Sequence, residues 1–169
     1  FWADQSSQDS AKELILNTKN ANDSLGATVL TIIKGAPAGL GEVLYNKLDA
    51  ALASAMMGIN GVKGVEIGDG INVATMLGSQ NNDFMDKNGF KSNHCGGILG
   101  GISNGNDIVI KSYFKPTPSI FKAQPTINLD GNEVICELRG RHDPCIGVRG
   151  SVVATAMARL VIADMLLLN

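Results

Sequence analysis

The spacing of hydrophobic residues divides the first third of the chain into three regular elements. Residues Ser7–Asn20 carry a narrow apolar stripe at helical spacing behind a polar residue that can cap it, and they predict a helix. The β-branched run Ala27–Ile33 predicts a strand. A loop rich in glycine and proline, Gly35–Gly41, comes next, and helical spacing resumes over Glu42–Met57.

Short apolar segments separated by glycines and polar runs make up the middle of the chain. Three of them predict strands, namely Val62–Ile67, Val73–Leu77 and Asp107–Phe114. The polar stretch Gly78–Phe90 predicts a surface loop. After the third strand, Lys115–Ser119 cannot continue a sheet, because each of its two prolines lacks a backbone donor.

The last part of the chain combines one further strand with one long helix. Asn132–Leu138 predicts the strand, and the helix begins at about Ser151. This helix is apolar on nearly every side, which is typical of a buried helix rather than a half-exposed one. Strands and helices therefore follow no repeating order, and the fold class expected is α+β.

Composition sets the size and the class of the molecule. A chain of 169 residues is long enough for one domain. With 44% hydrophobic and 18% charged residues it can bury a sizeable core, which argues against intrinsic disorder. Its 20 glycines fall in clusters without a period, which argues against a collagen or a flexible linker. Such clusters mark tight turns or close approaches of the backbone to something else.

Charge and cysteine content limit which partners the protein can bind and which cell compartment it is expected to occupy. A formal charge of -2 removes the general attraction for nucleic acid, although a local basic cluster can still bind a small anion. Three cysteines without a CxxC pair indicate reduced thiols in the cytoplasm. Arg159 and Asp164 interrupt the most apolar stretch, so no membrane span is expected. The chain starts at Phe1 rather than at Met, which suggests that a preceding part is absent.

The densest glycine cluster is Gly96–Gly101. It lacks the Gly-Lys-Ser/Thr ending of a phosphate-binding P-loop, and no good helix follows it, so the dinucleotide fingerprint does not apply either. Two interpretations stay open. The cluster is a tight turn between closely packed elements, or it is backbone lying flat against a planar ligand, which glycine alone permits.

Two other segments concentrate charge. Arg139–Cys145 places two guanidinium groups, an imidazole and a carboxylate next to a segment that must be buried, which favours a site over surface decoration. Lys115–Ser119 combines a positive charge with two hydroxyl groups on a rigid backbone. That segment is an ordinary exit loop or a phosphate site.

A metal site is the weakest of the hypotheses. His94 and Cys95, together with His142 and Cys145, offer ligand types that zinc prefers. The spacing between the two pairs is arbitrary, and adjacent His and Cys residues rarely point at one ion. No metal is therefore expected.

These motifs, in this order, resemble the chorismate synthase family. Gly140–Cys145 before the long apolar helix is similar to the family's C-terminal signature, and Lys115–Ser119 to its Lys-Pro flavin loop. Ser92–Ser103 resembles its glycine segment. Two further blocks, Ile59–Gly70 and Gly35–Glu42, match as well. The resemblance covers nearly the whole chain from about Asp23 onward.

The resemblance also indicates what the chain lacks. The family's two catalytic histidines, several substrate-binding arginines and one flavin segment belong to an N-terminal half for which no block occurs here. Neither His94 nor His142 takes the role of those histidines. Residues 1–169 are thus expected to form the C-terminal part of a single domain whose N-terminal half is absent.

The resemblance implies a lyase of the shikimate pathway, which leads to the aromatic amino acids. The family converts 5-enolpyruvylshikimate 3-phosphate to chorismate by trans-1,4 elimination of phosphate and needs reduced FMN, with no net redox change. NADPH reduces the flavin, directly or through a separate reductase. The implied fold is helices layered between antiparallel sheets, and the implied assembly is a cytoplasmic homotetramer. The alternative is a fragment that binds a flavin or an anion without catalysis.

The matched motifs imply specific roles for individual residues. Asp143 is the carboxylate expected near flavin N5, where it takes part in proton removal. Arg141 is expected to contact both flavin and substrate. The other expected flavin contacts lie in three matched motifs: Asn60, Gly61, Gly100, Lys115, Pro116, Thr117, Pro118 and Ser119.

The sequence departs from the family pattern in two places. After Arg149 the family commonly has Ala-Val-Pro, whereas this chain has Gly150-Ser151-Val152. That difference bears on how the last helix begins more than on chemistry. Gly61 stands where alanine is common, a change too small to remove backbone contacts.

Overall fold

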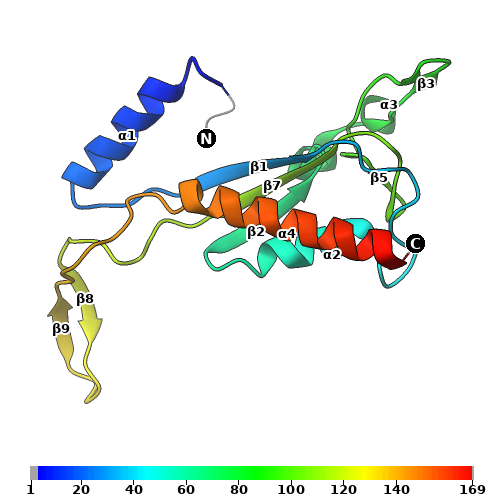
Figure 1. Ribbon diagram of the computed structural model, residues 1–169. Coiled ribbons are helices and arrows are strands. Elements are labelled where there is room, and N and C mark those ends of the chain that lie inside the picture. Colours follow the sequence, from blue (N-terminus) through cyan, green and yellow to red (C-terminus); the bar gives the residue numbers. More distant parts are fainter. Residues whose placement is uncertain (1–3, 169) are drawn as a thin grey trace.

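A three-stranded antiparallel sheet is the centre of the molecule. The computed structural model describes residues 4–168, so Phe1 and Trp2 lie outside the described part (Figure 1). The strands are β1 (Ala27–Ile33), β7 (Ile108–Phe114) and β2 (Val62–Ile67), in the order β1-β7-β2. In the register of the sheet, Phe114 lies opposite both Ala27 and Val62, and Ile110 lies opposite both Thr31 and Ile67.

Two helices, α2 (Leu48–Met57) and α4 (Gly147–Leu168), cover one face of this sheet, and α4 runs along β1 (Figure 1). Side chains of β7 alternate between buried and half-buried, as expected for an antiparallel strand with one covered face. The residues that form the hydrophobic core come from these five elements, the loop after β1 and the short strand that contains Ile98: Val29, Ala36, Leu40, Leu48, Leu52, Met56, Val62, Ile98, Ile108, Ile110, Phe114, Ala154, Ala158 and Met165.

Small residues bring α4 close to the sheet. A Cβ on Gly150 would stand 2.5 Å from the Phe114 ring, and one on Gly147 would overlap Ala27. Ala154 and Ala158 continue the same side of the helix and are buried. The backbone of α4 can therefore approach β1 and β7 to a distance that larger side chains would forbid.

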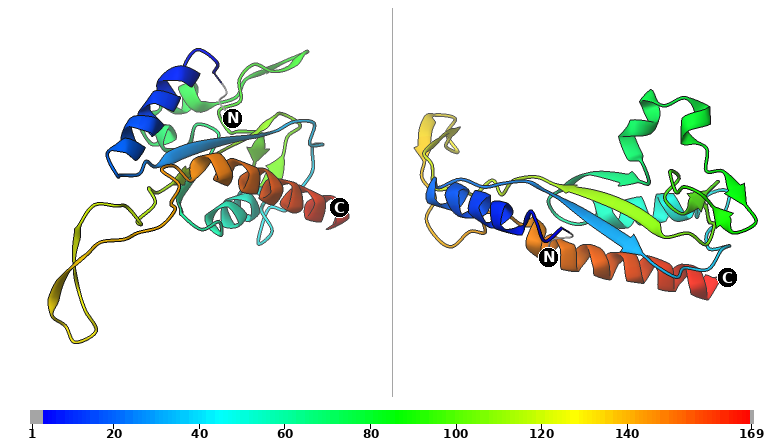
Figure 2. Two further views of the ribbon diagram at one scale, coloured as in Figure 1. Left: turned by 60° about the vertical axis from the view of Figure 1, so that its left-hand side comes forward. Right: turned by 90° about the horizontal axis from the view of Figure 1, so that it is seen from above.

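The remaining elements lie around this core. Figure 2 shows α1 and the β8–β9 hairpin standing away from the sheet, with the β3–β4 hairpin at the other end. The hairpins are two-stranded and antiparallel. These outer elements are α1 (Gln8–Asn20), a 3₁₀ helix (Gly70–Thr75), α3 (Gly78–Asn81), β3 (Met85–Asp86), β4 (Gly89–Phe90), β5 (Ile98–Leu99), β6 (Ile102–Ser103), β8 (Gln124–Ile127) and β9 (Glu133–Cys136).

The α+β class and most of the elements expected from the sequence are confirmed, including the break after β7. The helix expected from Glu42 begins only at Leu48. Before it the chain doubles back through a turn, with Tyr45 at φ 62° and the Glu42 N–H donating to the Asn46 carbonyl oxygen. The polar stretch 78–90 lies at the surface as expected, but it contains α3 and the β3–β4 hairpin.

Two other predictions are wrong. No strand occurs at Val73–Leu77, because the chain turns at Gly70, where φ is 59°, into the 3₁₀ helix, and the exposed Val73 and Leu77 have no sheet to join. The last helix begins at Gly147 rather than Ser151, and it is not buried on every side. Its small residues face the sheet, while large side chains such as Leu160 are exposed.

The helix α4 also bears on the expectation that no membrane span is present. By length and composition it is apolar enough to cross a membrane, although a core helix of a soluble protein passes the same test. Arg159 and Asp164 therefore do not exclude a span by themselves. The packing of α4 on β1 and α2 shows that one of its sides serves the core of this domain.

Candidate functional site

The loop that follows β7 is held by the sheet at its first residue. The Lys115 N–H donates to the Gly61 carbonyl oxygen at 2.8 Å, which continues the pairing of β7 with the segment before β2 by one step. Pro116 and Pro118 end that pairing and fix the backbone torsion φ. The Lys115 side chain is exposed at the point where the backbone is most constrained.

This loop forms one wall of an open groove of about 330 Å³. Six of the residues expected to bind flavin line the groove together with two residues that the sequence had not singled out: Asn60, Gly61, Lys115, Pro116, Thr117 and Pro118, with Lys63 and Ile146. Gly61 has φ 92°, and a Cβ there would stand 2.8 Å from Ile146 Cδ1. The two lysines of the groove suit a phosphate group, and the glycine in its lining leaves room for a flat apolar group.

The segment that carries Asp143 is tied to this loop through hydrogen bonds. Thr117 Oγ1 donates to the Asp143 carbonyl oxygen at 3.1 Å, and Ser24 Oγ donates to the Thr117 carbonyl oxygen at 2.6 Å. The Leu25 N–H donates to the Pro144 carbonyl oxygen at 2.7 Å. Because the Thr117 hydroxyl proton is used here, that hydroxyl is not free to donate to a phosphate group.

Asp143 makes an ion pair with the start of α4. Its Oδ2 lies 3.2 Å from Arg149 Nε, and the aspartate side chain is 30% exposed against 70% for the arginine. Ser119 and Asp143 line a second, water-sized pocket of about 40 Å³ beside the groove. Arg141, two residues earlier, is exposed at the surface. The groove and the signature motif are therefore neighbours in the fold.

His142 lies between these groups and is partly buried. Its ring centroid is 5.3 Å from that of Phe121, and its Nε2 atom is buried without a hydrogen-bond partner among the described residues. It lines the same small pocket as Asp143 and Ser119. The imidazole therefore packs as an aromatic ring here, with one polar atom turned into the interior.

Gly100 is an expected flavin contact that lies at the other end of β7. It belongs to the turn of the β5–β6 hairpin, near the start of β7, whereas Lys115 follows the end of that strand (Figure 1). At about 3.3 Å per residue, seven residues separate the two positions by roughly 20 Å. Gly100 is exposed and has φ 60°, and a Cβ placed on it would meet no atom within 4 Å, so its outer side is open to approach.

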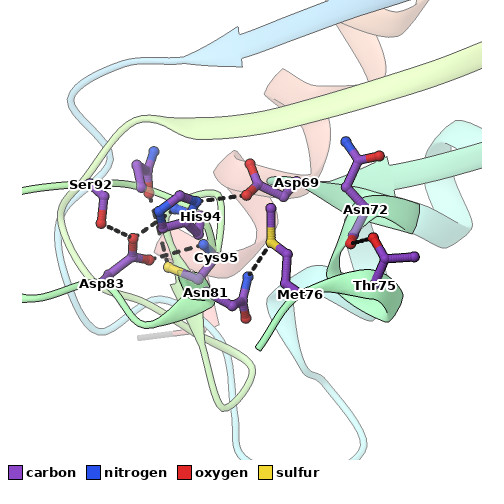
Figure 3. A network of polar contacts seen from close by, with 10 residues as sticks. Asp69, Asn72, Thr75, Met76, Asn81, Asp83, Ser92, His94 and Cys95 are labelled. Carbon is purple, nitrogen blue, oxygen red and sulfur yellow. Dashed lines mark hydrogen bonds and ion pairs between the residues drawn. The ribbon is translucent and has the colours of Figure 1, made fainter. Parts of the chain in front are cut away.

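A network of polar contacts holds the segment leading to this hairpin (Figure 3). The Asp83 carboxylate accepts hydrogen bonds from Ser92 Oγ at 2.6 Å, the His94 N–H at 2.7 Å and the Cys95 N–H at 3.0 Å. His94 Nδ1 lies 2.6 Å from Asp69 Oδ2. Sequence reasoning missed Asp69 although it lies inside the matched block Ile59–Gly70, and it missed Asp83 because an isolated aspartate in a polar loop carries no local signal.

The network shifts two pKa values. Partial burial raises the pKa of Asp83, but hydrogen bonds from Ser92, Cys95 and His94 outweigh it and leave that pKa well below its usual range. Burial raises the pKa of the Cys95 thiol, and the neighbouring Asp83 raises it further. Both shifts favour an ionised Asp83 and a protonated Cys95 thiol.

The four residues considered for zinc fall at opposite ends of β7. His94 and Cys95 belong to the network beside the β5–β6 hairpin, whereas Cys145 lies against Gly147 and Leu25 at the other end. Within residues 4–168, no group of three or more His, Cys, Asp or Glu side chains is arranged to hold a metal ion.

Comparison with known proteins places this geometry in a family. The family model described as chorismate synthase matches residues 1–167. The chain belongs to the chorismate synthase family. A chorismate synthase of Campylobacter fetus is 75% identical over 169 residues, and one of Helicobacter hepaticus is 59% identical over the same length. These matches cover 100% of this chain but 48% and 47% of the two relatives.

A solved structure agrees with the sequence matches. The protein described as "Crystal Structure of Chorismate Synthase" superposes with a TM-score of 0.77 at 31% identity, and the match covers 96% of this chain and 43% of that one. The chain thus spans about half the length of the chorismate synthases it matches. The family fold predicted from five short motifs is confirmed. Lys63 and Ile146 line the groove beside the residues that the motifs had singled out.

Proposed function

We propose that this chain is the C-terminal half of a chorismate synthase. In the complete enzyme it would take part in the trans-1,4 elimination of phosphate from 5-enolpyruvylshikimate 3-phosphate. The observation that carries the proposal is the contact between two matched motifs. Thr117 of the lysine loop donates a hydrogen bond to the backbone carbonyl oxygen of Asp143 in the signature motif, so the segment that carries the expected catalytic carboxylate adjoins the loop that lines the expected flavin groove.

Reduced FMN fits the groove by charge and by shape. Lys63 and Lys115 supply two positive charges to an open groove of about 330 Å³, as a phosphate group requires. Asn60 and Gly61 supply a polar edge and a close backbone. When bound, reduced FMN supplies electron density to the substrate as phosphate leaves. The lysines hold the phosphate end, and Pro116 and Pro118 keep the loop from collapsing onto the groove.

Asp143 and Arg141 carry the proposed chemistry of this half. The ion pair with Arg149 uses Oδ2 of Asp143, which leaves Oδ1 to accept a proton near the flavin. The exposed guanidinium of Arg141 is suited to a substrate that carries one phosphate and two carboxylates. Ser119 lines the small pocket beside Asp143 and offers a hydroxyl to the flavin. Gly100 lies outside this groove, and its exposed backbone would meet the flavin only where the bound flavin extends toward the β5–β6 hairpin.

The remaining expectations complete the proposal. The intact protein works in the cytoplasm as a homotetramer on a small-molecule substrate, with neither nucleic acid nor membrane as a partner, and NADPH reduces its flavin directly or through a reductase. The exposed apolar side of α4 supports a further half that covers it, since contiguous apolar surface marks an interface.

A hybrid protein tests the proposal. In this hybrid, the part of the Campylobacter fetus relative that lies outside the match is joined to this chain, which is 75% identical to the part it replaces. We expect the hybrid to form chorismate with reduced FMN and the isolated chain to form none. Chorismate from the isolated chain would contradict the proposal, and so would a hybrid that folds but neither binds FMN nor turns over.

A lysine substitution tests the flavin groove within the hybrid. Lys115→Ala removes a charge from the groove, and the lost contact to a charged group is worth about 1.5–3 kcal/mol, or roughly 10–150-fold in the FMN dissociation constant. Fluorescence titration measures this constant. Lys87→Ala removes an equal charge from the exposed β3–β4 turn and should leave it unchanged. Equal affinities of the two variants would remove Lys115 from the site.

A further inference from the structure

The segment that precedes the β5–β6 hairpin is held by side chains that come from outside it. Asp83 receives three hydrogen bonds from residues 92–95. Asp69 binds His94 at two atoms, through its carboxylate to Nδ1 at 2.6 Å and through its N–H to the carbonyl oxygen at 2.9 Å. Figure 3 shows Asp83 and Asp69 on opposite sides of His94, each reaching it from a different loop.

The hydrogen bonds that restrain the segment at His94 continue into the glycine cluster that follows it. Asn93 Oδ1 accepts the Gly97 N–H at 2.8 Å, and Asn93 Nδ2 donates to the Asp107 carbonyl oxygen at 2.8 Å. Gly68 and Gly96 touch through their backbones, so that a Cβ on either would overlap the other segment. The segment entering the hairpin is thus fixed at its side chains and at its backbone.

This network contributes little to the hydrophobic core. The side chains of His94 and Asp69 are 31% and 30% exposed, so water reaches both. Polar contacts that water reaches add little to stability, and even exposed ion pairs typically contribute only about 0.2–1 kcal/mol. What the network does specify is the path of the chain into the turn that contains Gly100. At that turn the backbone is exposed and its outer side is open.

We propose that Asp83 and the Asp69–His94 pair are positioning residues that set the β5–β6 hairpin in the conformation that meets the flavin. The inference rests on the proposed function, because it gives Gly100 its flavin contact. Asp83 acts through the backbone amides of His94 and Cys95, and Asp69 acts through the His94 ring. None of the three touches the flavin. Their removal loosens the hairpin and weakens flavin binding without removing a reacting group.

Substitution of Asp83 in the hybrid tests the proposal. Asp83→Asn keeps the size of the side chain but loses the anion that three donors share. We expect the FMN dissociation constant to rise about tenfold, while the turnover rate at saturating FMN stays within about twofold. Asp86→Asn is the matched control. Its carboxylate lies three residues on and contacts Asn88 and Lys91 instead of the hairpin segment.

A pair of histidine variants separates positioning from folding. In His94→Asn the side-chain amide can still donate to Asp69, whereas in His94→Phe the ring keeps its bulk and loses the donor. We expect His94→Phe to weaken FMN binding and His94→Asn to restore most of it. This pair also decides the matter if Asp83→Asn fails to fold. Equal FMN affinity in both histidine variants would overturn the proposal.

The Lys115→Ala variant, measured alongside, separates this inference from the function it rests on. If Lys115→Ala weakens FMN binding while Asp83→Asn and His94→Phe only lower the melting temperature, the network is structural and the inference fails although the proposed function stands. If the unmodified hybrid folds and binds no FMN, the proposed function fails and takes the inference with it. Weaker binding in all three variants supports both.

Discussion

The two ends of β7 present chemistry in opposite ways. At the Phe114 end, the backbone is fixed by prolines and by pairing with Gly61, and the lysine side chains reach outward into an open groove. At the Ile108 end, side chains turn inward to hold a glycine segment, and the backbone itself is what the molecule exposes. At the Phe114 end a fixed backbone exposes side chains, whereas at the Ile108 end side chains fix an exposed backbone.

Under the proposed function, this difference follows from what each end would contact. A phosphate group calls for mobile positive charge, which lysine supplies from a rigid loop. An exposed glycine turn presents its backbone to a ligand in one conformation only if something else restrains its freedom. The Asp83 network provides that restraint where the glycines have no side chains of their own to provide it. Four substitutions test the comparison, beginning with the largest expected effect.

Asp143→Asn should have the largest effect and act at the Phe114 end. General acid–base groups contribute about 10²–10⁴-fold, so the turnover rate of the hybrid should fall within that span, equivalent to roughly 2.7–5.5 kcal/mol. Single-turnover kinetics at saturating FMN and substrate measures it. Arg149→Ala removes only the partner of the ion pair. If the two variants lose affinity alike and both turn over normally at saturation, Asp143 is a positioning residue.

Gly96→Ala should be the most destabilising change at the Ile108 end. Both Gly96 and Gly100 have positive φ, 66° and 60°, so alanine strains either by about 1–2 kcal/mol. At Gly96 the new Cβ would also overlap the backbone of Gly68, whereas at Gly100 it meets nothing within 4 Å. Overlap adds about 1–3 kcal/mol. Urea unfolding of the two variants should differ by that amount, and equal losses would show that backbone strain alone matters.

Gly150→Ala should lower the free energy of unfolding by less, because the higher helix propensity of alanine offsets part of the packing loss. Its Cβ would stand 2.5 Å from the Phe114 ring. Overpacking of about 1–3 kcal/mol is offset by roughly 1 kcal/mol of helix propensity, leaving a loss of at most about 2 kcal/mol in unfolding free energy. Gly78→Ala, with nothing within 4 Å, is the control in the same thermal melts. A stable Gly150→Ala variant would mean that α4 can move away from β7.

The smallest expected effect is a pH dependence at the glycine end. Hydrogen bonding keeps the folded-state pKa of Asp83 below its usual value, so its contribution is present above the unfolded pKa and is lost as pH falls through the folded pKa. The destabilisation caused by Asp83→Asn should therefore shrink as the pH is lowered from 7 toward 3. Asn93→Ala removes uncharged hydrogen bonds from the same segment and should cost the same at both pH values.

The sequence predicted the parts of the fold that depend on local pattern. The bounds of β1 and of β2 agree with the apolar runs read from the chain, because a strand needs only a few β-branched residues between breakers. The helix over Glu42–Met57 was placed too early. Helical spacing persists there, whereas the turn at Tyr45 depends on tertiary contacts such as the Leu48 N–H with the Gly101 carbonyl oxygen.

The residues of the candidate site also divide into those that the sequence predicted and those that it missed. Motif resemblance singled out Lys115 and Asp143, and the fold places their segments next to each other. Lys63 was missed although it lies inside a matched block, because its direction depends on the irregular pairing between Val62 and Gly64 at the start of β2. Asp83 was missed because its partners are about ten residues away, in a loop whose path the sequence pattern does not specify.

The helix α4 has a consequence for how this polypeptide behaves during synthesis and storage. Gly147, Gly150, Ala154 and Ala158 face its own sheet, while most of its leucines and several of its valines are exposed, the reverse of an ordinary surface helix. Molecules presenting such a stripe bind chaperones, detergents and one another as the concentration rises. Expression of the 169-residue chain by itself should therefore yield inclusion bodies or soluble aggregates that bind hydrophobic dyes, and mild detergent should disperse them.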